Sequence, residues 1–142
     1  MSGLFQVFMA DDDKDDRFLM RMAFKEIGIP DSLLLFEDGV FLLEHLDAAQ
    51  NNGTQFPSLI LLDLNMPRLN GLEVLEKIKS KADWRKIPVV IFSTSDRDVD
   101  VQRAYELGAN SYITKPADFD RLTELVKCLH NYWGNTVTPP LL

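Results

Sequence analysis

Short, almost purely apolar runs alternate with longer segments of helical periodicity along most of this 142-residue chain. The runs cover residues 4–10, 33–36, 59–62, 89–92 and 112–113. A strand with one wet face alternates apolar and polar residues, whereas a parallel strand covered on both faces is apolar throughout. Strands that alternate with helices are typical of βαβ units. The pattern therefore predicts a parallel sheet with helices on both faces.

The segments between these runs carry apolar residues at helical spacing. The expected core stripes are Phe18, Met22 and Ile27 in a first helix, Val40, Leu43 and Leu46 in a second, and Leu72, Leu75 and Ile78 in a third. A fourth helix is expected at about 99–107, ending at Gly108, and a fifth begins near Asp118. Five strands and five helices predict one doubly wound α/β domain, followed by an extended tail over residues 134–142.

Composition excludes several classes of protein. The chain has 22 acidic and 15 basic residues, a net charge of −7, and one cysteine. Nucleic-acid binding needs clustered cations, and a disulfide framework needs paired cysteines, so neither is expected. The sequence shows no membrane-spanning run and no signal peptide, and we expect a cytoplasmic protein without nucleic-acid or membrane partners.

Polar residues follow the predicted strands at the points where chemistry is expected. Asp11 and Asp12 follow the first strand, Asp63 the third, Ser93 the fourth and Lys115 the fifth. The carboxyl ends of parallel strands meet at one edge of a doubly wound sheet, where ligands bind. We therefore expect these side chains to converge.

Clustered carboxylates repel one another unless a cation is present, and a site with few carboxylates favours Mg²⁺. Asp63 beside such a metal can act as a nucleophile that forms an aspartyl phosphate. The alternative for residues 11–16 is a solvated loop with helix-capping aspartates, and this explains Asp13, Asp15 and Asp16 best. A calcium loop is excluded because its sixth position would be Asp16 and its twelfth Met22.

Four motifs together resemble the receiver domain of two-component response regulators, the family of the chemotaxis protein CheY. They are MADDDKDDR, ILLDLNMPRLNGLEVL, IPVVIFSTS and GANSYITKP, and the resemblance extends from about residue 4 to residue 133. It implies a flavodoxin-like sheet of order 2-1-3-4-5, a receiver domain over residues 1–133, and a short tail over 134–142 with no output domain.

The resemblance also implies a role for each site residue. Asp63 would be the phosphoacceptor, and Lys115 would contact the phosphoryl group. Asp12 and Asp63 would bind Mg²⁺ directly, Asp11 through water, and Asn65 through its backbone carbonyl. Ser93 and Tyr112 would be the switch pair. Thr94 offers a second hydroxyl at the end of the same strand. Ser93 is favoured because the family places the hydroxyl residue five positions after the proline that is Pro88 here. The Lys115–Pro116 peptide is expected to be cis.

The function implied is that of a single-domain response regulator. A sensor histidine kinase, of phytochrome type to judge from the last residues, would phosphorylate Asp63, and the face formed by the fourth helix, fifth strand and fifth helix would change shape. The partner downstream would be a protein target or a phosphotransfer protein. Tyr132 and Trp133 would anchor the tail or contribute to a homodimer. The alternatives are a phosphohydrolase of the haloacid-dehalogenase type, disfavoured because Asn65 cannot transfer a proton, and a scaffold that is never phosphorylated.

Overall fold

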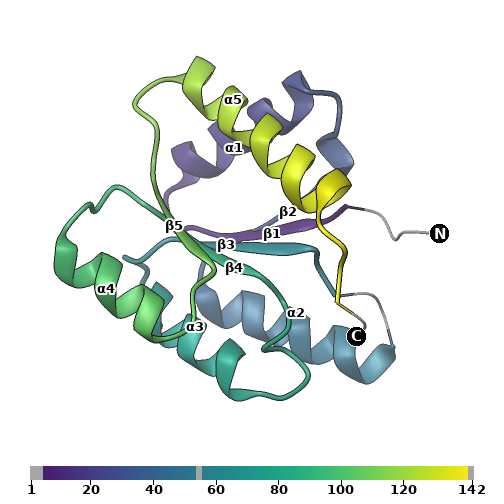
Figure 1. The fold of residues 1–142 in the computed structure, drawn as a ribbon, viewed down its shortest axis with the longest axis vertical. Helices are drawn as coiled ribbons and strands as arrows, with labels where there is room; N and C mark the ends of the chain where they lie inside the picture. Colours follow the sequence, from purple (N-terminus) through teal and green to yellow (C-terminus); the bar gives the residue numbers. More distant parts are fainter. Residues whose placement is uncertain (1–4, 54–55, 141–142) are drawn as a thin grey trace.

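The computed structural model of the chain describes residues 5–53 and 56–140, which form a central parallel sheet between two layers of helices (Figure 1). The elements are β1 (Val7–Ala10), α1 (Lys14–Glu26), the 3₁₀ turn η1 (Pro30–Ser32), β2 (Leu33–Phe36), α2 (Gly39–Asn52), β3 (Leu59–Leu62), α3 (Gly71–Ser80), β4 (Val89–Ser93), α4 (Asp98–Glu106), β5 (Ser111–Thr114), α5 (Phe119–Leu129) and the π-helical η2 (His130–Thr136). The strand order β2-β1-β3-β4-β5 confirms the doubly wound, flavodoxin-like fold. The part of the first predicted strand at residue 4 lies outside the described residues.

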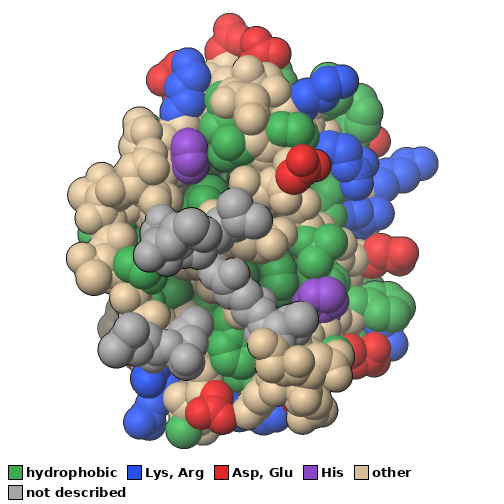
Figure 2. All heavy atoms as spheres, turned by 90° about the vertical axis from the view of Figure 1, so that its right-hand side faces the viewer, with side chains coloured by type: hydrophobic (Ala, Val, Ile, Leu, Met, Phe, Trp, Pro, Cys, Tyr) green, Lys and Arg blue, Asp and Glu red, His purple; other side chains and the backbone are tan. Residues whose placement is uncertain are grey.

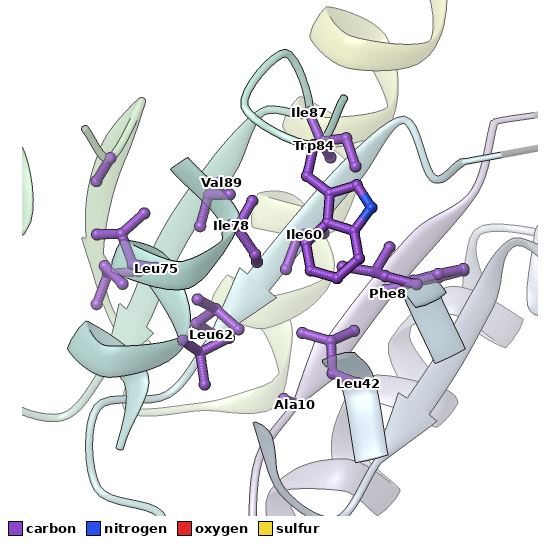
Figure 3. Packing of buried hydrophobic residues seen from close by; sticks show 14 of the residues in the cluster. Phe8, Ala10, Leu42, Ile60, Leu62, Leu75, Ile78, Trp84, Ile87 and Val89 are labelled. Carbon is purple, nitrogen blue, oxygen red and sulfur yellow. The ribbon is translucent and has the colours of Figure 1, made fainter. Parts of the chain in front are cut away.

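Strand alternation divides the core between the two faces of the sheet. Phe8 and Ile60 point toward α2, α3 and α4, where they pack with Trp84, Leu42 and Ile78 (Figure 3). Val7, Met9, Leu59 and Leu61 point to the other face and pack against α1 and α5. Successive residues of a strand face opposite ways, so both layers of helices are fixed by the same short strands.

Polar side chains cap the N-termini of α1, α2, α3 and α5. The Asp13 carboxylate accepts hydrogen bonds from the first turn of α1, and the Asp38 and Asp118 carboxylates do the same for α2 and α5. Asn70 and Glu73 form a reciprocal capping box at α3. Each cap contributes about 1 kcal/mol to helix stability. The predicted capping role of Asp13 is confirmed.

The predicted core stripe of α1 is wrong for Phe18 and Met22, whereas Ile27 packs against the core as expected. Phe18 is 55% exposed and Met22 36% exposed, whereas Met20, Ala23 and Phe24 are buried. This helix carries apolar residues on more than one face, and the stripe of Met20 and Phe24 is the one that meets α5 and the sheet. Periodicity alone could not choose between two stripes of the same spacing.

Two further expectations differ from the structure: among the described residues the extended tail begins at Val137 and not at Gly134, and the Lys115–Pro116 peptide is not cis. The helix continues as η2 through Thr136, because Gly134 lets the chain pass against the Phe5 and His130 rings, and Trp133 packs on the core. The residues described after Thr136 have no regular structure. Tyr132, unlike Trp133, is exposed to solvent. The Lys115–Pro116 peptide is trans, the form that an X–Pro bond favours by roughly 0.5–1 kcal/mol.

None of the helices in the described part of the chain has the length and apolar character needed to cross a membrane. Figure 2 shows the molecule from the right-hand side of Figure 1; charged side chains lie mainly around the margin of this face, and several basic ones stand together at its upper right.

Candidate functional site

The backbone at the carboxyl ends of the strands is held by hydrogen bonds that extend the sheet ladder. The Asp11 amide donates to the Phe36 carbonyl, and the Asp63 amide donates to the Ala10 carbonyl, both at 3.1 Å. The Lys115 amide donates to the Ser93 carbonyl at 2.8 Å. Each residue is therefore fixed by the neighbouring strand, and its side chain starts from a rigid position.

Asp11, Asp12 and Asp63 come together as the sequence predicts. Each offers a carboxylate oxygen, and the three oxygens lie within 4.8 Å of one another. Asp11 is fully buried, Asp63 is 8% exposed, and Asp12 is exposed to solvent. Three oxygens from hard ligands with one open side suit a divalent cation that keeps some of its waters, as Mg²⁺ does.

Burial makes the negative charge in this cluster unfavourable. Desolvation, together with the charges of Asp11 and Asp12, raises the pKa of Asp63 to about 6, although Lys115 and the Leu64 amide act in the opposite direction. Desolvation also raises the pKa of Asp11, against the effect of its hydrogen bond from Lys115. A bound cation would relieve the same electrostatic cost that raises these two pKa values.

Lys115 reaches into this cluster, and its ammonium lies closer to the carboxylates of Asp11 and Asp16 than to that of Asp63. Its Nζ is 2.7 Å from Asp11 Oδ2 and 2.7 Å from Asp16 Oδ2, and 3.6 Å from Asp63 Oδ2. Burial disfavours the charged ammonium, but the hydrogen bonds to Asp11 and Asp16 outweigh it and raise the pKa of Lys115. The lysine therefore stays charged and provides a fixed positive group beside Asp63.

The connection between β3 and α3 is packed closely against Asp63. A Cβ at Gly71 would collide with the carbonyl oxygen of Asp63, and the Gly71 amide donates to the Leu64 carbonyl at 2.9 Å. Leu64 and Met66 are buried, while Asn65 between them is exposed. The backbone carbonyl of Asn65 remains a predicted metal ligand.

Ser93 and Tyr112 lie on neighbouring strands and are linked through Ser95. Ser93 is fully buried and its Oγ accepts a hydrogen bond from the Ser95 amide at 3.2 Å, whereas Thr94 is exposed. The Tyr112 hydroxyl donates to the Ser95 carbonyl at 2.8 Å, and burial raises its pKa. The buried position of Ser93 favours it over Thr94 as the hydroxyl of the site.

The sequence prediction missed one residue that contacts the site, Asp16. The sequence predicts a solvated, helix-capping role for Asp16, but its carboxylate pairs with Lys115, which lies 99 residues away in the chain. The cap of α1 comes from Asp13 alone, so the assignment of Asp16 is wrong. No local pattern marks such a long-range pair, because Asp16 has the residue type and helix position of an ordinary first-turn acid.

Similarity to known proteins agrees with this geometry. Residues 7–127 match the response regulator receiver domain. Response regulator Rcp1 of a Synechocystis species is 36% identical over 135 residues, which is 94% of this chain and 92% of that protein.

Two solved structures resemble the whole chain. The phosphorylated cyanobacterial phytochrome response regulator RcpA superimposes with a TM-score of 0.87 at 35% identity, covering 98% of this chain and 100% of that chain. The Mn²⁺-bound form of Rcp1 superimposes with a TM-score of 0.81 at 36% identity, covering 96% and 99% respectively. The chain therefore belongs to the family of response regulator receiver domains, the CheY-like proteins of two-component systems.

Proposed function

We propose that this protein accepts a phosphoryl group from the phosphohistidine of a sensor histidine kinase onto Asp63, in a Mg²⁺-dependent reaction. The observation that carries the proposal is the setting of Asp63. Its carboxylate is almost buried at the end of β3, grouped with Asp11 and Asp12, and 3.6 Å from the Lys115 ammonium. A carboxylate nucleophile needs such neighbours, since the group it receives is more negative still.

In the proposed step, one Asp63 oxygen attacks phosphorus and forms an O–P bond. The P–N bond to the kinase histidine breaks, and the leaving imidazole nitrogen keeps the electron pair. The Lys115 ammonium donates hydrogen bonds to the phosphoryl oxygens and offsets their charge. The low exposure of Asp63 restricts water at the acyl phosphate that results.

The three carboxylates fit a divalent ion because their oxygens are close enough to share one. Asp12 and Asp63 would be direct ligands, Asp11 would act through water, and the Asn65 carbonyl would complete the protein's share. The metal-bound form of the similar protein Rcp1 supports a cation here. When bound, Mg²⁺ would offset negative charge on the transferring group.

Signalling would follow from the switch pair. An acyl phosphate adds oxygen acceptors near Ser93, and we expect the Ser93 hydroxyl to donate to one of them. Ser93 and Tyr112 already share Ser95 as a hydrogen-bond partner, so a shift at Ser93 reaches Tyr112. The surface of α4, β5 and α5 would then change its shape, a population shift biased by local charge.

The proposed partner is a kinase of phytochrome type, because RcpA is a phytochrome response regulator and is similar over its whole length. The receiver domain would cover residues 1–133, with residues 134–142 as a short tail, and the signal would pass to a protein target or a phosphotransfer protein in the cytoplasm. A homodimer, with the exposed Tyr132 at its surface, belongs to the same proposal. The protein would catalyse its own phosphorylation and dephosphorylation and would not act on a separate substrate.

Incubation with a small phosphodonor such as acetyl phosphate tests the proposal. We expect the wild-type protein to gain one phosphoryl group with Mg²⁺ and none with a chelator, as measured by intact mass. Asp63→Asn should stay unlabelled, while Asp96→Asn, which changes an exposed aspartate, should be labelled normally. Labelling of Asp63→Asn to the wild-type level would refute the assignment.

The two alternatives predict other outcomes of the same experiment. A phosphohydrolase of the haloacid-dehalogenase type would turn over a phosphomonoester many times, whereas the proposed protein would not, because Asn65 occupies the position of the acid/base aspartate in such enzymes. A scaffold would take up no phosphoryl group under any condition.

A further inference from the structure

Lys115 is held by a carboxylate outside the metal cluster. Its Nζ is 2.7 Å from Asp16 Oδ2, nearly 1 Å closer than its 3.6 Å approach to Asp63 Oδ2. The Lys115 side chain is only 10% exposed and that of Asp16 is 32% exposed. A short charge-assisted hydrogen bond in such a setting is stronger than an ordinary surface ion pair.

The backbone fixes the position from which Asp16 reaches Lys115. Asp16 lies in the first turn of α1, where its amide donates to the capping Asp13 carboxylate at 3.3 Å. The Asp16 carboxylate does not cap the helix and instead reaches Lys115 in the segment after β5. Asp16 and Lys115 are among the residues that line a pocket, together with Leu19, Phe92 and Phe119, so the pair borders open space instead of packed core.

An ammonium group has three N–H donors, and two of them are taken by Asp11 and Asp16. A phosphoryl group on Asp63 would bring new acceptors and further negative charge beside the same ammonium. Lys115 can give that group a second donor only by releasing one of its present partners. Asp11 is fully buried and fixed by the Asp13 amide, whereas Asp16 is partly exposed and can turn to solvent.

We propose that Asp16 is a competing counter-ion that holds Lys115 away from the phosphoryl group and so limits how readily Asp63 is phosphorylated. The inference rests on the proposed function, because it assigns Lys115 to the phosphoryl group. Asp16 acts through Lys115 and is therefore a positioning residue. Removing its charge releases the ammonium for the phosphoryl oxygens.

The test compares Asp16→Asn with Asp15→Asn in the full chain at one Mg²⁺ concentration. Asp15 is the neighbouring first-turn acid, is exposed, and forms no ion pair with the other described residues, so its substitution removes the same charge without touching Lys115. With acetyl phosphate as the donor, Asp16→Asn should be phosphorylated about two- to fivefold faster than wild type. Asp15→Asn should react at close to the wild-type rate.

A second measurement, made without phosphodonor, follows the Lys115 ammonium by nuclear magnetic resonance. Its protons should exchange with water faster in Asp16→Asn than in the wild type or Asp15→Asn, and Asp16→Glu should restore part of the protection. Equal rates of phosphorylation in the two asparagine variants, or unchanged exchange at Lys115, would overturn the inference. A wild-type protein that is not phosphorylated on Asp63 would instead overturn the proposed function, so the two failures are distinguishable.

Discussion

Asp63 is a carboxylate that the fold holds at an energetic cost. Its pKa is raised by burial to about 6 from the ordinary 3.8, so the folded state binds a proton more tightly than the unfolded state does. This group therefore favours folding most at low pH. Its contribution to the free energy of unfolding falls as the pH rises from about 4 to above 6, when no cation is bound.

Asp63→Asn should consequently stabilise the metal-free protein. At pH 7.5 we expect the free energy of unfolding to rise by about 2 kcal/mol, since the variant no longer buries a charge, and at pH 4 the gain should nearly vanish. Urea denaturation at both pH values measures this, with the exposed Asp96→Asn as control. A gain of equal size at the two pH values would contradict the account of Asp63.

Single residues also show where prediction from sequence succeeds. Asp11, Asp12 and Asp63 could be grouped in advance because the carboxyl ends of parallel strands must meet at one edge. Asp16 could not be assigned, since its partner is Lys115 and only the folded chain brings them together. In a sequence, Asp16 cannot be told apart from a solvated acidic residue in the first turn of a helix.

Among the elements, the connection from β3 to α3 depends on an ion pair to hold its shape. Arg68 has φ +66°, and among the described residues it is the one non-glycine with a positive φ. Its Nη2 donates to the buried Asp38 Oδ2 at 2.6 Å, and its guanidinium lies 5.2 Å from the centre of the Phe41 ring. These contacts tie the loop after Asp63 to the first turn of α2, and they offset a left-handed conformation that costs about 1 kcal/mol.

Two substitutions of Arg68 separate the ion pair from the backbone strain. Arg68→Ala should lower the free energy of unfolding by about 1–2 kcal/mol, because the Asp38 carboxylate stays buried without its partner. The loss is no larger because Arg68 is half-exposed and solvent screens the ion pair. Arg68→Gly loses the same pair but relieves the strain, so it should be about 1 kcal/mol more stable than Arg68→Ala. Urea denaturation of both variants checks the order, and a glycine variant no more stable than the alanine variant would contradict it.

The same pair gives a pH dependence of the opposite sign to that of Asp63. Burial would raise the pKa of Asp38, but the Arg68 guanidinium and the Phe41 amide outweigh it, and the pKa is lowered. The stability that Arg68 provides is present above the ordinary pKa of 3.8 and is lost as the pH falls through the lowered value. The difference between wild type and Arg68→Ala should therefore shrink in acid.

The elements themselves were largely predictable. The runs at β2 and β3 have the bounds expected, because continuous apolar runs between turn residues leave few alternatives. The sequence pattern misplaces the buried stripe of α1, since this helix has apolar residues on several faces. It also begins the extended tail at residue 134, whereas η2 continues to Thr136 with Gly134 close against Phe5. Tertiary contacts decided both.

At the scale of the whole molecule, the misassigned stripe becomes a surface feature. Phe18, Leu19 and Met22 are exposed on α1, which starts directly after the acidic cluster, and Leu19 also lines the pocket beside Lys115. Exposed apolar groups gathered next to a reactive site are typical of a docking surface for a protein partner. A kinase seated on this face would bring its phosphohistidine toward Asp63.

Phe18→Ser should separate docking from chemistry. We expect phosphotransfer from the cognate histidine kinase to fall about tenfold, as for loss of an apolar anchor, while labelling by acetyl phosphate stays unchanged. Val99→Ser, an equally exposed apolar site on α4, serves as the control and should leave both reactions intact. Equal losses with kinase and with acetyl phosphate would show that Phe18 supports the site itself and not the docking of a partner.

The overall architecture and the edge that bears the site followed from the alternation of strands and helices. The layers were predictable because each short strand must be covered on both faces. The net charge of −7 argues against a nucleic-acid partner, and the folded chain adds that Asp16 joins the site through its ion pair with Lys115.

Mapping the acyl phosphate tests the central claim most directly. After reaction with acetyl phosphate and Mg²⁺, borohydride converts a phosphorylated aspartate to homoserine, and peptide mass spectrometry locates the change. The account predicts homoserine at Asp63 and unchanged Asp11, Asp12 and Asp16, with no conversion when Mg²⁺ is removed. Conversion at another aspartate, or none in a protein that binds Mg²⁺ normally, would contradict it.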